Sequence, residues 1–269
     1  MDLQACAAQN LERVREQKPL VHNITNFVVM NYTANALLAI GASPVMAHAP
    51  NEVREMVSFA GALVLNIGTL TDDWVASMVS AGERASEQGT PIILDPVGSG
   101  ATRLRTSAAK QIIRHTKLSV VRGNASEVLS LQDETSTTKG VDAIHTVADA
   151  AEAAKTLAGE LKTVLAITGP TDLVTDGSRV IQVSNGHPLM GSVTGTGCTA
   201  TAIIGAFLAV DQDPLQATAT ALAYFGLAGE VASENASAPG SFMIGMLDAL
   251  YTITPDQLEA GGRFEVLSG

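Results

Sequence analysis

The sequence is poor in aromatic residues and in charge. Aromatic side chains make up 4% of its 269 residues, and Asp, Glu, Lys and Arg together make up 16%. Hydrophobic residues reach 46%, so the chain can bury a sizeable core and does not have the composition of a disordered protein. We expect a single domain spanning residues 1–269, built from layers that small Gly and Ala side chains allow to pack closely.

Positive charge is also scarce. The chain has 16 Lys and Arg residues against 27 Asp and Glu residues, for a formal net charge of −11. A protein that binds nucleic acid needs a basic surface, so this charge argues against nucleic acid, and we expect no such partner. An anionic small molecule such as a nucleotide must then be held locally, by backbone amides, a few basic side chains and a metal ion.

Cysteine is scarce, and long apolar runs are missing. The two cysteines, Cys6 and Cys198, are too few for a disulfide framework. The first residues lack the basic start and the apolar run of a signal peptide. The longest uncharged stretch, residues 180–210, is truly apolar only at residues 200–210, which is too short to cross a bilayer. We therefore expect a cytoplasmic protein without a membrane partner.

Short apolar runs alternate with longer helical patterns along the chain. The runs lack the polar alternation of half-exposed strands, which indicates strands covered on both faces, as in a parallel sheet. They lie at residues 19–23, 44–46, 62–67, 91–95, 118–121 and 164–168. Helical patterns lie at residues 71–88, with Thr71 or Asp72 as the N-cap, and at residues 147–161. This alternation predicts an α/β fold with a mostly parallel central sheet flanked by helices.

The segment after the last of these runs departs from the alternation. Two β-rich runs within residues 172–183 flank an Asp-Gly pair at Asp176 and Gly177, which predicts one local hairpin. A glycine-rich turn follows, and beyond it we expect helices only. One of these helices begins with Asp213 as its N-cap and Pro214 as its first residue.

Ligands of open α/β sheets collect beyond the carboxyl ends of the strands. The candidates are therefore the residues that end or follow the apolar runs. They are His22, Asn23, Thr25, Asn26, Met46, His48, Asn66, Gly68, Asp95, Gly98 and residues 122–127 and 168–172. Each is ordinary turn chemistry when taken alone, so the signal lies in their number. His22 and His48 lack the spacing of metal ligands, so we expect structural histidines rather than a zinc site.

Residues 191–205 are the most informative stretch. Gly195 and Gly197 precede a run of small apolar residues typical of a buried helix, and they let the backbone approach a ligand closely. The free amides of the first helical turn and the helix dipole form an anion site suited to phosphate. Cys198 lies where these amides would stabilise a thiolate or a neighbouring oxyanion. The alternatives are an ordinary strand-to-helix turn and, for Cys198, a small buried hydrophobe.

Four segments carry a family resemblance, in the same order and over essentially the whole chain. They are His22-Asn23-Ile24-Thr25-Asn26, Leu94-Asp95-Pro96-Val97-Gly98, Arg122-Gly123-Asn124-Ala125-Ser126-Glu127 and Thr194-Gly195-Thr196-Gly197-Cys198. With them the chain resembles the hydroxyethylthiazole kinase family within the ribokinase-like fold. The Asn-x-x-Glu pattern is shared widely among ribokinase-like enzymes, whereas the first and last segments point to this family. Most relatives of that fold have Asp where this chain has Cys198.

The resemblance implies a three-layer ribokinase-like sandwich and a reaction. ATP would donate its γ-phosphoryl group to the primary hydroxyl of 4-methyl-5-(2-hydroxyethyl)thiazole, a salvage step in thiamin biosynthesis. Mg²⁺ would bridge the phosphate oxygens, held by Asp95 and Glu127 directly or through water. The resemblance also implies a homotrimer with active sites at subunit interfaces.

The same resemblance assigns the other site residues. Arg122 and Thr168 match the family's ATP-binding positions, and we add to them Asn124, Gly169 and Thr194. Met46 and Gly195 match its substrate positions. A small flat thiazole needs a mainly apolar pocket with a few hydrogen-bonding groups, and we expect Asn23, Val28, Met30 and Gly68 to line it together with Met46. Charge on the transferring phosphoryl group would be stabilised by the amides of Gly195, Thr196, Gly197 and Cys198. Cys198 would position the substrate hydroxyl, and whether it also acts as a base stays open, because an ordinary thiol is only partly ionised at neutral pH.

Simpler interpretations exist for single residues. Asn124 and Glu127 are both residues that cap helices, and Arg122 at a strand end can pair with a surface carboxylate. Thr168 can belong to a plain turn, and Met46 can fill the core.

Other functions are also consistent with parts of the sequence. A dehydratase that repairs hydrated nicotinamide cofactors and a pyrimidine kinase would keep the fold, but both are expected to carry an acidic residue in place of Cys198. A thiol hydrolase or transferase would use Cys198 as its nucleophile, but no His–Asn or His–Asp arrangement accompanies it. A binding-only protein would bind nucleotide without turnover. Asp95, Glu127 and the Gly-Thr-Gly-Cys segment favour the kinase.

Overall fold

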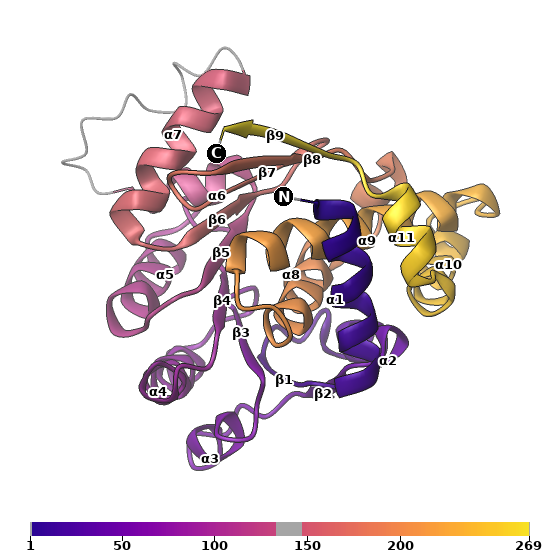
Figure 1. Cartoon of the computed structure of the whole chain (residues 1–269). Coiled ribbons are helices and arrows are strands. Elements are labelled where there is room, and N and C mark those ends of the chain that lie inside the picture. The colour runs from indigo at the N-terminus through magenta and orange to yellow at the C-terminus, as the bar shows by residue number, and fades with distance from the viewer. Residues whose placement is uncertain (1, 133–146, 269) are drawn as a thin grey trace.

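The computed structural model describes residues 2–132 and 147–268. These residues form a sheet with the strand order β2-β1-β3-β4-β5-β6-β7-β8-β9 (Figure 1). The strands are β1 (Leu20–Ile24), β2 (Ser43–Val45), β3 (Ala62–Asn66), β4 (Ile92–Asp95), β5 (Val120–Gly123), β6 (Val164–Ile167), β7 (Asp172–Thr175), β8 (Val180–Val183) and β9 (Phe264–Ser268). Neighbours from β2 to β6 pair in parallel, and β7, β8 and β9 continue the sheet in antiparallel pairs.

The central strands are buried on both faces. Every residue of β3 and β4 is buried. In β3, Val64 packs into the hydrophobic cluster on one face, whereas Leu63 and Leu65 pack into the cluster on the other face. Because successive side chains of a strand point to opposite faces, a strand covered on both sides needs an unbroken apolar run.

Helices cover both faces of the sheet and complete three layers (Figure 1). One layer consists of α1 (Leu3–Gln17), α2 (Met30–Ile40), α8 (Thr196–Leu208), α9 (Pro214–Glu234), α10 (Pro239–Thr252) and α11 (Pro255–Gly261). The other consists of α3 (Val53–Val57), α4 (Asp72–Gln88), α5 (Arg103–His115), α6 (Ala125–Leu129) and α7 (Val147–Leu161). In the part of the chain that the structure describes, no helix is both long and apolar enough to span a bilayer.

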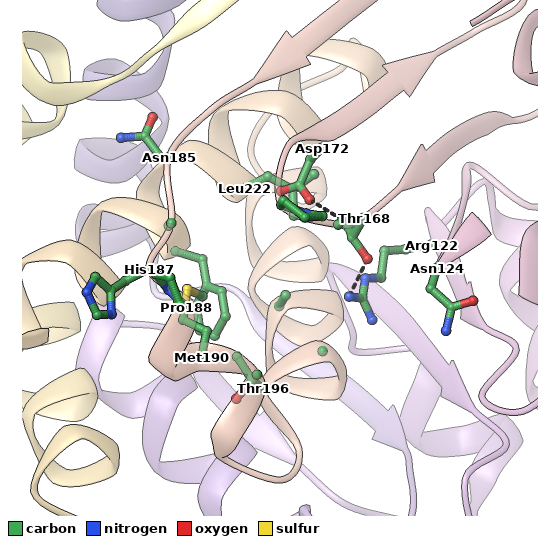
Figure 2. A pocket seen from close by; sticks show the side chains of 18 residues that line it. Arg122, Asn124, Thr168, Asp172, Asn185, His187, Pro188, Met190, Thr196 and Leu222 are labelled. Carbon is green, nitrogen blue, oxygen red and sulfur yellow. Dashed lines mark hydrogen bonds between the residues drawn. The ribbon is translucent and has the colours of Figure 1, made fainter. Parts of the chain in front are cut away.

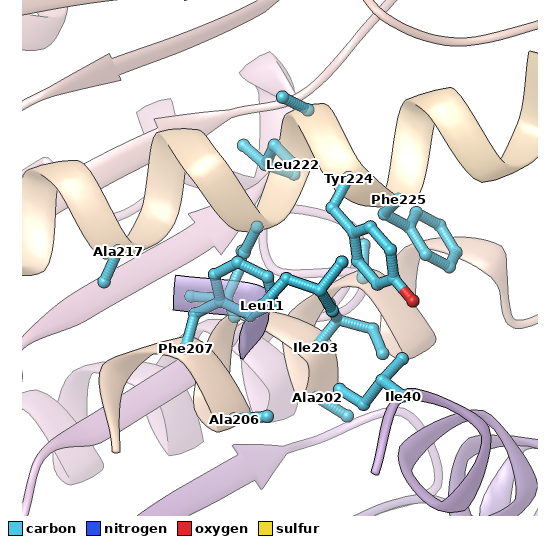
Figure 3. Packing of buried hydrophobic residues seen from close by; sticks show 14 of the residues in the cluster. Leu11, Ile40, Ala202, Ile203, Ala206, Phe207, Ala217, Leu222, Tyr224 and Phe225 are labelled. Carbon is cyan, nitrogen blue, oxygen red and sulfur yellow. The ribbon is translucent and has the colours of Figure 1, made fainter. Parts of the chain in front are cut away.

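Helix α8 lies against the middle of the sheet, where it contacts β1, β3 and β4. The approach is close: a Cβ at Gly205 would lie 2.8 Å from Cγ2 of Val64, so a side chain there would push the helix off the sheet. On its other side, Phe207 packs against Tyr224 of α9, with ring centroids 5.9 Å apart (Figure 3). This packing on both sides fixes where the first turn of α8 lies.

The structure confirms the predicted α/β sandwich with a mostly parallel sheet. It also confirms the helix at residues 147–161 and the hairpin, in which Gly177 adopts a φ of 93° that suits glycine. Of the two N-cap candidates for α4, the cap is Thr71, whose side chain accepts a hydrogen bond from the amide of Trp74. Asp213 caps α9 with Pro214 as its first residue, as predicted.

The prediction that only helices follow the glycine-rich turn is wrong. After α11 the chain returns to the sheet as β9, which pairs antiparallel with β8 and covers the edge that β8 would otherwise leave unpaired. Strand β9 is an edge strand, and its Val266 is 54% exposed. It therefore lacks the long apolar run by which the buried strands are found in the sequence.

Candidate functional site

A chain of hydrogen bonds runs along the carboxyl edge of the sheet. Asn26, just after β1, donates from Nδ2 to Sγ of Cys198 at 3.4 Å and to Oδ1 of Asn66 at 2.8 Å. Asn66 ends β3, pairs in register with Asp95 at the end of β4, and donates to its Oδ2 at 2.8 Å. The predicted strand-end residues thus meet the first turn of α8 in one network.

Asp95 is fully buried, and its two oxygens differ. Besides Asn66, Oδ2 accepts a hydrogen bond from the hydroxyl of Thr201 at 2.8 Å, and Nη1 of Arg122 lies 3.8 Å away. Oδ1 has no hydrogen-bond partner among the described residues. Burial raises the pKa of Asp95 to about 6, against the opposing effect of the Arg122 guanidinium. Asp95 therefore offers an unpaired carboxylate oxygen of the kind a hard cation binds.

Arg122 reaches from β5 toward the end of β6 and toward α8. Its Nη2 donates to Oγ1 of Thr168 at 2.5 Å. A Cβ at Gly197 would lie 2.6 Å from Nη1 of Arg122, so a glycine is needed for the guanidinium to come this close to the helix. Gly195, the N-cap of α8, has a φ of 81°, which also suits glycine. The guanidinium and the free amides of α8 together form a positive site for an anion.

Asn124 and Glu127 form a capping box at the start of α6. Oδ1 of Asn124 accepts from the amide of Glu127, and Oε2 of Glu127 accepts from the amide of Asn124, both at 2.9 Å. Oε1 of Glu127 accepts from the amide of Gly98 at 2.8 Å. Both carboxylate oxygens of Glu127 already accept a hydrogen bond, so the interpretation of Asn124 and Glu127 as helix-capping residues agrees with the structure. Glu127 therefore fits a metal through bound water better than as a direct ligand.

The carboxylates fit Mg²⁺ rather than a cation that needs a full set of protein ligands. Among residues 2–132 and 147–268, no group of three or more His, Cys, Asp or Glu side chains is arranged to hold a metal. Mg²⁺ does not need such a group, because it is commonly bound by one or two carboxylates, water and substrate phosphates. Asp95 meets this requirement through its unpaired Oδ1.

The thiol of Cys198 is partly buried in the first turn of α8. Burial and the nearby Asp95 carboxylate raise its pKa, and the amides of Asn66 and Asn26 only partly oppose them. The thiol is therefore protonated at neutral pH. A protonated thiol is a poor covalent nucleophile and a weak base, which argues against the thiol hydrolase or transferase.

A cavity of about 470 Å³, here called the α8 cavity, opens beside the first turn of α8 (Figure 2). Part of its lining is polar: Arg122, Asn124, Thr168, Gly169, Asp172, Thr196 and Gly197. The rest comes from the segment after β8 and from α8 and α9: Asn185, Gly186, His187, Pro188, Met190, Gly191, Ala200, Leu222, Phe225 and Gly226, with Pro170. In Figure 2, Arg122 and Asn124 lie on one side of the cavity, and His187, Pro188 and Met190 lie on the other.

The α8 cavity brings together most of the predicted nucleotide residues. Four of the five line it, whereas Thr194 is exposed and lies outside its lining. Sequence reasoning missed residues 185–190 and singled out no side chain of α9. A signal existed for the segment, since β8 runs in the same direction as β6 and the Asn-Gly and His-Pro pairs follow its carboxyl end. Leu222 and Phe225 gave none, because α9 is apolar on most of its surface.

The predicted substrate residues lie in different surroundings. Val28 is 63% exposed, whereas Met30 and Met46 are partly buried. Gly68 packs on the side chain of Asn26, where a Cβ would lie 2.6 Å from Nδ2. Asn23 is buried and donates from Nδ2 to the carbonyl of Val21 within its own strand.

The two histidines beside this region make structural contacts. Nε2 of His22 donates to the carbonyl of Ala47 at 2.8 Å, and burial lowers the pKa of His22 so that the ring stays neutral. The ring of His48 contacts Trp74, which in turn contacts Phe27, with centroids 4.9 and 4.5 Å apart. Phe27 is still 66% exposed, so this rim of the site presents an uncovered apolar surface.

Solved structures with a similar fold include one with high sequence identity. A hydroxyethylthiazole kinase from Pyrococcus horikoshii OT3 superposes with a TM-score of 0.90 at 47% identity, covering 97% of this chain and 99% of that one. A pyridoxal kinase from Staphylococcus aureus, in complex with AMP-PCP and pyridoxal, superposes with a TM-score of 0.61 at 17% identity, covering 93% and 99%. The second likeness shows the fold alone, as does that to a ribokinase-like superfamily protein from Enterococcus faecalis V583, with a TM-score of 0.62 at 15% identity. Together they confirm the ribokinase-like architecture.

Sequence relatives match this chain along nearly its whole length. The hydroxyethylthiazole kinase of Desulfotalea psychrophila is 68% identical over 259 residues, which are 96% of this chain and 95% of that protein. The hydroxyethylthiazole kinase of Chloroflexus aurantiacus is 51% identical over 269 residues, the full length of both. The model of the hydroxyethylthiazole kinase family matches residues 11–256. These matches confirm the resemblance carried by the four sequence segments, and the chain belongs to the hydroxyethylthiazole kinase family.

Proposed function

We propose that this chain transfers the γ-phosphoryl group of ATP to the primary hydroxyl of 4-methyl-5-(2-hydroxyethyl)thiazole. Membership in the hydroxyethylthiazole kinase family supports the reaction. The meeting of Arg122, Thr168 and the first turn of α8 at one cavity carries the assignment of the site. Phosphoryl transfer depends mainly on alignment and charge neutralisation, and these groups supply both.

The first turn of α8 is the centre of the proposed reaction. The amides of Gly195, Thr196, Gly197 and Cys198 lie at the positive end of a helix of 13 residues, so they stabilise negative charge on the transferring group. Cys198 positions the substrate hydroxyl. Because the loose transition state requires little proton removal at an early stage, a protonated thiol is compatible with turnover.

Asp95 and Glu127 hold Mg²⁺ in this proposal, Asp95 through its unpaired Oδ1 and Glu127 through metal-bound water. The ion supplies charge neutralisation on the phosphate oxygens when it is bound. The chain's own contribution is to keep Oδ1 of Asp95 free, because Asn66 and Thr201 both bind Oδ2.

ATP occupies the α8 cavity with its phosphates against Arg122 and Thr168. Asn124 and Gly169 line the same end, and Thr194, which is exposed, contributes only at the rim. The base then lies against the apolar wall formed by α9 and the segment after β8, since a flat heterocycle gains most from an apolar lining.

The thiazole lies on the other side of Cys198, near the carboxyl ends of β1 and β2. Met46 and Gly195 contact it, and Asn23, Val28, Met30 and Gly68 complete the lining. Phe27 and Val28 are 66% and 63% exposed, so one chain alone leaves this site open. A homotrimer with its active sites at subunit interfaces would cover them.

The reaction is tested by turnover with ATP and Mg²⁺ against hydroxyethylthiazole, hydroxymethylpyrimidine and hydrated NADH. We expect a thiazole monophosphate, identified by phosphorus NMR and mass spectrometry, with one ADP formed for each product. Activity on either of the other substrates without thiazole phosphorylation would keep the fold and overturn the proposed specificity.

Cys198→Ala should lower kcat by about 10-fold or more while the KM for ATP changes by less than about twofold, because the thiol touches the acceptor and not the nucleotide. Steady-state kinetics measure both constants. Cys198→Asp is the matched variant: it installs a stronger base at the same place and should turn over faster than Cys198→Ala. An alanine variant with the wild-type rate would remove Cys198 from the mechanism.

Asp95→Asn should lower kcat/KM by about 100-fold or more, because a neutral amide is a much weaker ligand for Mg²⁺. The melting temperature should change little, since removal of a buried charge offsets the loss of the carboxylate near Arg122, and the acceptor for Asn66 and Thr201 remains. Activity over a Mg²⁺ titration and thermal unfolding are the measurements. Full activity combined with a lower melting temperature would make Asp95 a structural anchor instead.

The oligomeric state is measured by light scattering, and we expect a mass of three chains. Helices α2 and α10 pack together and expose Leu38 and Ile244 by 59% and 62%, which is a surface suited to a subunit contact. Ile244→Asp should lower the mass and weaken thiazole turnover, with ATP binding kept. A wild-type chain that is monomeric and fully active would contradict the interfacial active site.

A further inference from the structure

Asp172 is a charged residue of the α8 cavity that the proposed reaction does not use. It is the first residue of β7, and the antiparallel register of Ile167 with Leu173 sets it across the turn from Thr168. Its Oδ1 accepts a hydrogen bond from the amide of Gly169 at 3.0 Å. This contact holds the carboxylate against the end of β6, next to the proposed phosphate-binding side chains.

The position of Asp172 is intermediate between the two ends of the α8 cavity. On one side lie Thr168 and Arg122, and on the other lies Leu222 of α9, as Figure 2 shows. Strand β7 also pairs with β8, where Asp172 is in register with Val183, just before the chain turns into the segment that forms the opposite wall. Asp172 thus lies between the proposed phosphate-binding end of the cavity, at Arg122 and Thr168, and its apolar end at Leu222.

A carboxylate at this place needs a hydrogen-bond donor. Burial raises the pKa of Asp172 to about 6, so the side chain is mostly ionised at neutral pH. Its charge opposes the binding of a polyphosphate, and a carboxylate can accept several hydrogen bonds, of which the Gly169 amide supplies one. A ligand that brings hydroxyl donors to this point would satisfy the remaining acceptor capacity.

A nucleotide has such donors at the corresponding place. With its phosphates on Arg122 and Thr168 and its base on Leu222 and Phe225, the ribose lies between them, opposite Asp172. We propose that Asp172 accepts hydrogen bonds from the ribose hydroxyls and thereby selects ribonucleoside over deoxyribonucleoside triphosphates as phosphoryl donors. This inference rests on the proposed location of ATP in the α8 cavity.

The test compares ATP, 2′-deoxy-ATP and 3′-deoxy-ATP as donors for the wild-type chain and for Asp172→Asn. For the wild type, we expect the KM of at least one deoxynucleotide to exceed that of ATP by about 10- to 100-fold with a similar kcat. The missing ribose hydroxyl leaves the charged carboxylate of Asp172 without that donor. Asp172→Asn can keep the acceptor for the Gly169 amide. The substitution should raise the KM of ATP and reduce the ratio between the KM of a deoxynucleotide and that of ATP to about threefold or less.

Glu160→Gln is the matched control, because Glu160 is exposed on α7 and its substitution makes the same change in net charge. It should leave all three KM values unchanged. Equal KM values for the three nucleotides with the wild type would overturn the inference. So would an Asp172→Asn variant that shifts all three by the same factor, which is what a purely structural role at the β6–β7 turn would cause.

Thr168→Val separates this inference from the location on which it rests. One outcome is a raised KM for ATP in Thr168→Val together with equal KM values for ATP and the two deoxynucleotides in the wild type. It would reject the ribose contact and keep the nucleotide in the α8 cavity. An unchanged KM for ATP in Thr168→Val would reject the location itself, and the ribose contact with it.

Discussion

The buried carboxylate of Asp95 is the interaction on which the site depends. Burying a charge is costly unless hydrogen bonds and an opposite charge compensate for it. Here Asn66 from the sheet and Thr201 from α8 bind one oxygen, and Arg122 stands 3.8 Å away. Asn66 is thereby oriented so that its own oxygen receives the amide of Asn26, which then donates to Cys198. One carboxylate thus links the strands, the helix and the cavity.

The packing of α8 determines whether these groups can meet. Gly205 lets the helix lie close to β3, and Gly197 lets the guanidinium of Arg122 lie against the first turn of α8. A side chain at either glycine would displace the helix or the arginine, and the free amides would no longer face the α8 cavity. The anion site is therefore a consequence of close packing along the whole helix and not only of its glycine-rich start.

The parts of the site that could be predicted are those whose sequence signal has a direct structural cause. Residues that end parallel strands share one edge of the sheet, which is why Asn26, Asn66 and Asp95 were found together. The lining from α9 could not be predicted, because Leu222 and Phe225 lie in a helix that is apolar on most sides, and tertiary packing decides which of these sides lines the α8 cavity. Strand β9 was missed for a different reason: it is a short edge strand in which Glu265 interrupts the apolar residues, and its pairing with β8 is long-range.

The thiol of Cys198 is best understood together with Asp95. Most relatives of the ribokinase-like fold are expected to have Asp at this position, which would place a second carboxylate near the buried one. Two close carboxylates disfavour each other's ionised form, so the pKa of at least one would rise. A neutral thiol avoids this conflict and leaves Asp95 ionised, while in the proposed reaction the amides of α8 carry the developing charge. The cost is a weaker base, which a phosphoryl transfer with late proton removal can accept.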